Sequence, residues 1–241
     1  MADDLAARVA GVGALADPAR HALYDYVAAQ PGSVSREEAA NAIGLPLHSA
    51  KFHLDRLAER GLLDVEFRRL SDRQGPGAGR PTKLYRRSSR ELTVSLPARC
   101  YDLAAELLAT AIDRCAHEAV PVGLAVQDAA RAEGIRIATQ LDDDAGAEAG
   151  LEVTADPPTG GLSELQLACS LMARYGFEPR MDEQELRLTN CPFDRLAAGH
   201  AELVCTMNLA LIGGVLEGLQ TRVLSPRLAP EPGFCCVRVS S

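Results

Sequence analysis

Apolar residues recur at helical spacing in three short segments near the beginning of the chain. They predict helices over residues 18–30, 35–44 and 46–61. Asp17-Pro18 has the form of an N-cap followed by proline at the first helical position. Ser35 with Glu38 has the form of a capping box at the start of the second segment.

Two strand-like segments follow these helices, over residues 62–70 and 82–87, and they flank a loop rich in glycine and proline at 75–81. Three helices followed by a two-stranded ribbon with a basic loop is the order of a winged helix-turn-helix. This fold places its recognition helix, here residues 46–61, in the major groove of DNA. We therefore expect residues 12–95 to form a winged helix-turn-helix DNA-binding domain.

The predicted recognition helix has two distinct faces. Five apolar side chains share one face and are expected to pack inward: Leu47, Ala50, Leu54, Leu57 and Ala58. Five other side chains share the opposite face and are predicted to contact DNA: His48, Ser49, Lys51, Phe52 and Arg56. An exposed phenylalanine suits contact with a thymine methyl group. His53 projects toward the edge of the core and is interpreted as a partly buried structural histidine.

Charge is distributed unevenly along the chain. The formal net charge of −8 would argue against a nucleic-acid partner if it were spread evenly. Residues 1–95, however, contain 14 basic and 12 acidic residues, a net charge of +2, and the remainder carries −10. Within the basic stretch 67–90 we predict four further DNA contacts: Arg69, Arg80, Lys83 and Arg86. A hairpin that is merely solvated is the alternative interpretation of this stretch.

The second half of the chain alternates between helical and strand patterns. A helix over 98–119 is expected to act as a linker and a dimer seam, a helix follows over 124–141, and the acidic stretch 142–161 is expected to be a surface loop. The elements expected after it are a helix at 163–175, a hairpin of 177–181 with 185–189, a short helix opened by Cys191-Pro192, an apolar helix at 201–219, and strands at 223–229 and 234–239. The predicted fold class is α+β, with a winged helix-turn-helix domain at 12–95, a linker or dimerisation helix at 96–119 and a C-terminal α+β sensor domain at 120–241.

Composition narrows the class of protein. A chain of 241 residues that is 47% hydrophobic has ample material for a core, which excludes a disordered tail protein. No apolar run is expected to span a membrane, and the first residues do not resemble a secretory leader. We therefore expect a cytoplasmic protein with no membrane partner. In that reducing compartment the seven cysteines are not expected to form disulfides.

The cysteines divide into two groups. Cys100, Cys115 and Cys169 lie among apolar helical positions and are expected to be small buried side chains. The other four are candidates for chemistry: Cys191, Cys205, Cys235 and Cys236. Cys191 lies at a predicted helix start, where the helix dipole favours a low thiol pKa, and Cys235 is expected on the core side of its strand. Three such thiols could converge on a soft metal, but because the chain has no CxxC pairs, spacing alone favours a set of inert core cysteines.

Two strings in the first half carry a family resemblance. The segments VSREEAANAIGLPLHSAKFHLDRLAERGLL and GAGRPTKLYRR resemble the winged-helix regulators of the ArsR-like superfamily over residues 12–95. The resemblance implies a bacterial transcription regulator that binds a palindromic operator in double-stranded DNA as a homodimer.

A second resemblance covers the C-terminal part. The segments LRLTNCPFDRLAAGHAELVC and PGFCCVRV are similar to SufR-type regulators, whose sensor domain holds an iron–sulfur cluster through three cysteines. The resemblance implies a [2Fe–2S] or [4Fe–4S] cluster held by Cys191, Cys205 and Cys235, with Cys236 or His200 as possible substitutes. It further implies that the cluster controls the affinity for DNA.

Three alternative functions stay open at this stage. The same fold could act as a thiol-redox regulator through Cys191 and Cys205, or bind a small apolar effector. An enzyme that uses Cys205 and His200 is disfavoured, because a spacing of five residues places them far apart around a helix. The protein is therefore expected not to be an enzyme.

Overall fold

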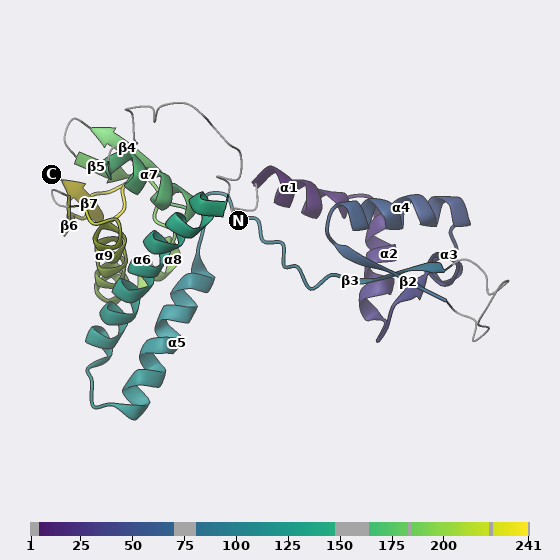
Figure 1. Ribbon diagram of the computed structural model, residues 1–241, viewed down its shortest axis with the longest axis horizontal. Helices are drawn as coiled ribbons and strands as arrows, with labels where there is room; N and C mark the ends of the chain where they lie inside the picture. Colours follow the sequence, from purple (N-terminus) through teal and green to yellow (C-terminus); the bar gives the residue numbers. More distant parts are fainter. Residues whose placement is uncertain (1–4, 70–80, 148–163, 183–184, 222–223, 241) are drawn as a thin grey trace. The chain divides into compact units, whose positions relative to one another are not determined.

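A computed structural model describes residues 5–69, 81–147, 164–182, 185–221 and 224–240 (Figure 1). The chain divides into two compact units, residues 1–94 and 95–241. Each unit has a hydrophobic core of its own. The units are described in turn.

The N-terminal unit contains helices α1 (Leu5–Ala14), α2 (Pro18–Ala29), α3 (Arg36–Ile43) and α4 (Leu47–Glu59), and strands β1 (Val34–Ser35), β2 (Leu63–Arg68) and β3 (Thr82–Arg87). The strands pair antiparallel in the order β1-β3-β2. Asp17 caps α2 by accepting a hydrogen bond from the Arg20 backbone N–H, and Ser35 with Glu38 forms the predicted capping box. The predicted elements of this unit are therefore present, together with α1 and β1, which the sequence pattern did not indicate.

Helix α4 is amphipathic, largely as its pattern predicts. Ala50, Leu54 and Leu57 are fully buried, whereas Phe52 on the opposite face is 65% exposed. Leu47 differs from the expectation, because it is 45% exposed. It is the first residue of the helix, and the buried face begins one turn later at Ala50.

The C-terminal unit contains helices α5 (Tyr101–His117), α6 (Val122–Ala147), α7 (Glu164–Arg174), α8 (Asp194–Gly199) and α9 (Ala201–Gly218), and strands β4 (Pro179–Asp182), β5 (Glu185–Leu188), β6 (Ser225–Leu228) and β7 (Val237–Ser240). The strands pair antiparallel in the order β4-β5-β7-β6. Leu186, Leu188, Val237 and Val239 face the helices and are fully buried. The mixture of helices and sheet agrees with the α+β class.

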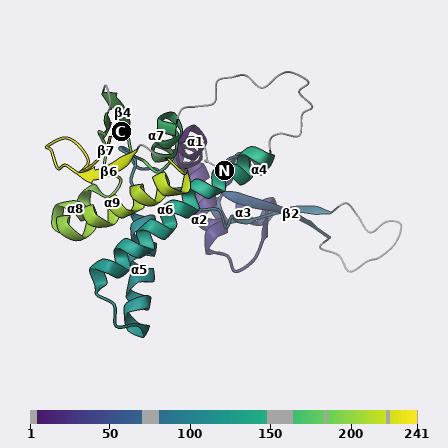
Figure 2. The ribbon, with the colours of Figure 1, turned by 60° about the vertical axis from the view of Figure 1, so that its left-hand side comes forward.

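Helices α6 and α9 lie side by side through the centre of this unit (Figures 1 and 2). Two glycines permit their backbones to approach closely. A Cβ atom on Gly134 of α6 would lie 2.2 Å from the Leu211 carbonyl oxygen, and one on Gly214 of α9 would lie 2.1 Å from the Arg131 carbonyl oxygen. Because these are sub-van-der-Waals distances, the crossing requires glycine on both helices.

Several boundaries in this unit differ from the sequence-based prediction. Helix α5, expected as a linker, packs Ala104, Leu107 and Ala111 into the C-terminal core. Helix α6 continues to Ala147, although 142–147 was predicted as loop, and the rest of that loop (148–161) lies outside the described residues. Helix α8 begins at Asp194 rather than at Pro192. Cys235 and Cys236 immediately precede β7 instead of lying within it.

Helix α9 corrects one further expectation. Among the described residues it is the helix that is long and apolar enough to cross a membrane by length and composition. It packs eight buried residues, including Val204, Leu211 and Ile212, into the core of the unit. Its apolar composition is thus used in the packing of the C-terminal unit.

Candidate functional site

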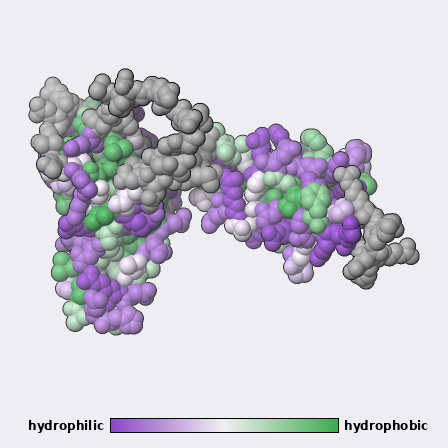
Figure 3. Space-filling view, in the orientation of Figure 1, coloured by the Kyte–Doolittle hydropathy of each residue, from purple (hydrophilic) through white to green (hydrophobic). Residues whose placement is uncertain are grey.

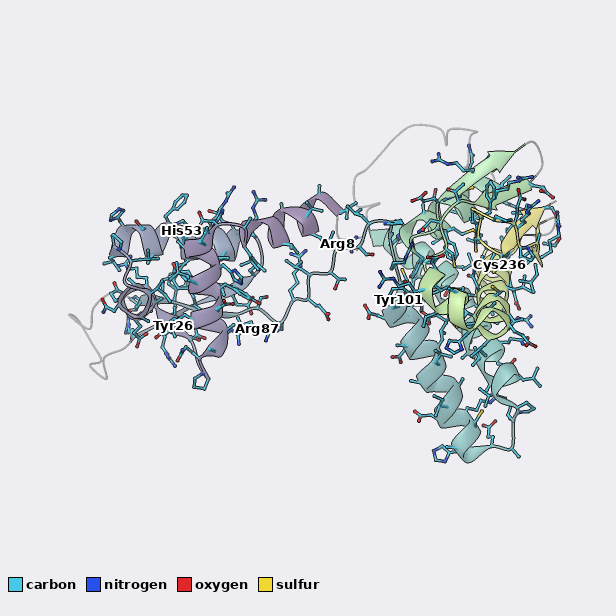
Figure 4. The ribbon with its side chains drawn as sticks, turned by 180° about the vertical axis from the view of Figure 1, so that it is seen from behind. Arg8, Tyr26, His53, Arg87, Tyr101 and Cys236 are labelled. Atoms are coloured by element: carbon cyan, nitrogen blue, oxygen red, sulfur yellow. The ribbon has the colours of Figure 1, made fainter. Side chains whose placement is uncertain are left out.

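The outward face of α4 forms a polar surface with one aromatic side chain at its centre. His48, Lys51 and Phe52 are exposed, whereas Ser49 and Arg56 are partly buried. The ring of Phe52 contacts His53 edge-to-face, with centroids 5.4 Å apart, and His53 is partly buried as predicted (Figure 4). A shallow groove of about 890 Å³ runs along this face.

Acidic side chains border the same face. Arg56 Nη1 donates a hydrogen bond to Glu59 Oε2 at 3.1 Å. Such an exposed ion pair contributes little to stability, so Arg56 can exchange Glu59 for a base or phosphate group at low cost. The face therefore has the donors and the apolar contact that reading a major groove requires.

A buttress of three side chains joins α4 to the wing strand β3. The Tyr85 hydroxyl donates a hydrogen bond to Asp55 Oδ1 at 2.7 Å, and Lys83 forms an ion pair with the same carboxylate. Burial alone would raise the pKa of Asp55, but the hydrogen bonds from Lys83 and Tyr85 outweigh it and hold that pKa below its usual range. Lys83, predicted as a DNA contact, is thus part of the joint between helix and wing.

The remaining predicted wing contacts have different surroundings. Arg69 is exposed at the end of β2, and Arg86 is exposed with an ion pair to Asp64 at 3.3 Å. Arg80 lies outside the described residues. Phe67 on β2 is 69% exposed and lines a second groove with Lys51 and Lys83. Sequence reasoning missed Phe67, although an apolar side chain on the outward-facing positions of a two-stranded ribbon could have indicated it.

Three cysteines come together where β5 leads into α8 and the C-terminal segment leads into β7. Because these segments are neighbours, the Cys235 backbone N–H donates to the Leu188 carbonyl at 2.8 Å. The thiol of Cys191 lies close enough to that of Cys235 to influence its ionisation, and Cys235 is influenced in the same way by its neighbour Cys236. Cys235 is buried beside the core residues Val237 and Val239 as predicted, and Cys236, labelled in Figure 4, is partly buried.

Asn208 of α9 completes this thiol cluster, here defined as Cys191, Cys235, Cys236 and Asn208. Its Nδ2 donates a hydrogen bond to Cys235 Sγ at 3.1 Å, and its side chain is 0% exposed. Its Oδ1 is buried with no hydrogen-bond partner. Among the described residues the other buried polar side chains, Ser35 and Asn190, have no such unpaired atom. An unpaired buried amide oxygen is costly and marks a place for a further group.

The structure does not bring Cys205 and His200 into this contact. Cys205 is partly buried on α9, three residues before Asn208. His200 is exposed between α8 and α9, beside a shallow cavity of about 480 Å³. In the part of the chain that the structure describes, no three His, Cys, Asp or Glu side chains are arranged to hold a metal ion.

The expected low pKa of Cys191 is wrong. Its contact with Cys235 and its burial raise the pKa of the Cys191 thiol well above the usual range. The pKa of Cys235 is also raised, to about 11, because its contact with Cys236 and its burial outweigh the lowering effect of Cys191. The short helix α8 begins two residues beyond Pro192, so its dipole stabilises a Cys191 thiolate only weakly.

The three other cysteines occupy structural positions. Cys100 donates a hydrogen bond to the Tyr175 carbonyl at 3.1 Å, and Cys115 donates to the Val120 carbonyl at 3.3 Å. Cys169 packs against the core of the C-terminal unit. All three are partly buried, rather than fully buried as expected.

Comparison with known proteins bears on the N-terminal unit. A family model described as a helix-turn-helix domain matches residues 15–66, which span α2, α3, α4 and most of β2. No curated protein and no solved structure matches the chain significantly. Together with the paired wing strands, the match identifies a winged helix-turn-helix domain, and this domain supports a DNA-binding transcriptional regulator.

Proposed function

We propose that this protein is a cytoplasmic transcriptional regulator that binds operator DNA as a homodimer, and that an iron–sulfur cluster in the C-terminal unit controls its affinity for DNA. The observation that carries the proposal is the thiol cluster, in which the buried Cys235 and the partly buried Cys191 and Cys236 gather beside the buried amide of Asn208.

The chemistry of the side chains gathered here suits such a cofactor, although the arrangement of the described residues does not yet bring three ligands together. Thiolates are the usual ligands of iron–sulfur clusters, and N–H donors to their sulfur atoms tune the reduction potential, as Asn208 is placed to do. Cys191 and Cys235 are the two ligands in contact. Cys205 precedes Asn208 by three residues, so its Cβ lies roughly 5–6 Å from that of Asn208. When bound, the cluster would make the protein sensitive to oxidants and to the supply of iron, because both change whether the cluster is present.

The choice of ligands beyond Cys191 and Cys235 divides into two options. Cys205 is the third ligand in the proposed set, and its approach requires a shift of α9 or of the segment that carries Cys191. Cys236 is the substitute, because it already contacts Cys235. His200 is a more distant substitute, since it is exposed at the N-terminal end of α9.

One spectrum tests the cofactor. Protein purified without oxygen should show visible absorption with matching iron and sulfide, and Cys191→Ser and Cys235→Ser should abolish it. Comparing the chromophore of Cys205→Ser with that of Cys236→Ser identifies the third ligand, because only the variant that lacks this ligand should lose the absorption. Cys115→Ser is the matched control and should keep the chromophore, because the Cys115 thiol lies outside the thiol cluster and donates to the Val120 carbonyl between α5 and α6. Full absorption in both the Cys191 and Cys235 variants would refute the proposal.

The DNA contacts have a separate test. Phe52→Ala and Arg56→Ala should weaken binding by about tenfold or more and relax sequence preference, because base contacts are worth roughly 1–3 kcal/mol each. Arg80→Ala should weaken binding to all sequences alike. Arg131→Ala, a surface arginine of the C-terminal unit paired with Glu217, is the control and should bind normally. Normal binding in all three test variants would contradict the docking of α4 and the wing.

A redox thiol switch is the second candidate, and the contact of Cys191 with Cys235 favours it. Peroxide would convert one thiol to a sulfenic acid, and the other would displace water to form a disulfide. The raised pKa of both thiols slows the first step. Mass spectrometry of metal-free protein after mild peroxide decides between the two, because only the switch predicts a Cys191–Cys235 disulfide.

A further inference from the structure

The segment that carries Cys191 is bonded to the segment where the C-terminal unit begins. Asn190, the residue before Cys191, is 6% exposed and has all of its amide groups in hydrogen bonds. Its Nδ2 donates to the Ala98 carbonyl at 2.9 Å and to the Gly176 carbonyl at 2.6 Å. One buried side chain therefore joins the Cys191 segment to residue 98 and to the turn that follows α7.

Arg99 makes the same connection from the opposite direction. Its Nη1 donates to Asn190 Oδ1 at 2.5 Å and to the Cys191 carbonyl at 3.4 Å, and its Nη2 lies 3.6 Å from Asp194 Oδ2. The Cys100 backbone N–H adds a hydrogen bond to the Pro192 carbonyl at 3.1 Å. Residues 98–100 and 190–194 thus form one hydrogen-bonded layer, which we name the junction clamp.

The junction clamp lies at the start of the C-terminal unit, next to the segment that leads from the DNA-binding unit. The C-terminal unit begins at Ser95, and residues 98–100 are its first part with long-range hydrogen bonds to the rest of that unit. They also lead directly into α5, which starts at Tyr101. Any displacement of the clamp is delivered to the chain that connects to the DNA-binding unit.

The two sides of the thiol cluster differ in how firmly they are held. Cys235 and Cys236 are bonded to the sheet region through the Leu188 carbonyl and the Ala229 N–H. Cys191 lies in the turn between β5 and α8, outside regular structure. When the thiols close around a common ligand, the turn at 190–194 moves more readily than the sheet.

We propose that Asn190 and Arg99 are positioning residues that transmit the ligation state of Cys191 to the segment 98–100, and thereby set the affinity for DNA. This inference rests on the proposed function. A shift of Cys191 must either break buried hydrogen bonds of Asn190, which is costly, or carry Ala98 and Arg99 with it. Ligation and DNA binding are therefore coupled through the clamp rather than through the core at large.

The first experiment compares DNA affinity with and without the cluster. The probe is a duplex selected by the wild-type chain from a random pool, and each protein is assayed as purified without oxygen and after iron removal by a chelator. We expect the ratio of the two Kd values to be about tenfold or more in wild type, within the range of known couplings. Arg99→Ala and Asn190→Asp, which lose the N–H donors of the clamp, should bring that ratio below about threefold at unchanged absorbance per chain.

This experiment has one control variant, and each of its two contrary outcomes overturns a different proposal. Arg131→Ala removes a surface ion pair of the same unit and should keep the wild-type ratio. A wild-type ratio in Arg99→Ala with the chromophore intact overturns the clamp, because a merely structural arginine would behave in this way. Absence of any chromophore in wild type instead overturns the proposed function.

A second measurement tests the junction clamp even if the wild-type protein has no chromophore. Hydrogen exchange at the Cys100 amide, which bonds to Pro192, should accelerate at least fivefold after exhaustive alkylation of the wild-type thiols, and less in Cys191→Ser alkylated in the same way. The Arg99→Ala variant should already exchange fast and respond little. Exchange at Cys100 that is slow and unaffected by alkylation would show that the clamp does not follow Cys191.

Discussion

Asp55 shows how one side chain can set the geometry of a DNA-binding surface. It lies on α4, yet its carboxylate accepts from Tyr85 and pairs with Lys83, both on β3. Tyr85 is fully buried, so its hydroxyl depends on this acceptor. The joint keeps the recognition helix and the wing in a constant relation.

Removing the acceptor should therefore destabilise the N-terminal unit. We expect Asp55→Ala to lower the free energy of unfolding by about 1–3 kcal/mol, because it leaves the Tyr85 hydroxyl buried and unpaired, and Tyr85→Phe to cost about 1 kcal/mol. Circular dichroism in urea measures both. Equal stability of Asp55→Ala and wild type would contradict the buttress.

The same carboxylate predicts a pH dependence. Its pKa in the folded chain lies below the ordinary value of 3.8, so the unfolded chain takes up its proton first as the pH falls. The stabilising contribution is complete above about pH 5 and disappears as the pH falls through the lowered pKa. Urea titrations from pH 7 to pH 3 should show that the free energy of unfolding falls more steeply with pH in wild type than in Asp55→Asn.

Asn208 contrasts with Asp55, because only one of the two polar atoms of its buried amide has a hydrogen-bond partner. We expect Asn208→Leu to leave the metal-free protein as stable as wild type, or more stable by about 1 kcal/mol, since a half-satisfied buried amide is replaced by an apolar group of similar size. The chromophore of the same variant should be lost faster on exposure to air. A strongly destabilised metal-free variant would indicate that Asn208 is purely structural.

At the scale of elements, the crossing of α6 and α9 decides the geometry of the C-terminal unit. Gly214→Ala would force a Cβ against the Arg131 carbonyl and should destabilise by about 1–3 kcal/mol or more. Gly213→Ala is the matched control on the adjacent position, where a Cβ would lie 3.6 Å from Pro226. It should be neutral or stabilising by up to about 1 kcal/mol, because alanine is the better helix former. Equal thermal midpoints of the two variants would contradict the close crossing.

At the scale of the whole molecule, charge follows the division into units. Residues 1–94 carry a net charge of +2 and residues 95–241 carry −10. Figure 3 shows polar side chains over most of the visible surface, with apolar areas scattered among them. The positive unit is the one with the helix-turn-helix match.

This division predicts different behaviour of the two units. A fragment of residues 95–241 should not bind DNA at any salt concentration, because its net charge repels phosphate. The full chain should bind, with an affinity that falls steeply as salt rises. Fluorescence anisotropy with the selected duplex measures both, and binding by the C-terminal fragment would contradict the assignment.

The sequence by itself determined most of the N-terminal unit, although it did not indicate α1 or β1. Capping residues, helical periodicity and the two wing strands are local signals, and local signals specify α2, α3, α4, β2 and β3 within a few residues. It also identified Cys235 as the core-facing member of the cysteine pair, since side chains alternate along an extended segment.

Only the tertiary structure decided how the second half uses its residues. The contact of Cys191 with Cys235, the raised pKa of both, the unpaired oxygen of Asn208 and the bonds of Asn190 to residue 98 all join positions far apart in the chain. Which strands pair, and how closely α6 meets α9, fixes these neighbours. Periodicity reports which face a side chain takes on its own element, and it carries no information on what faces it from another.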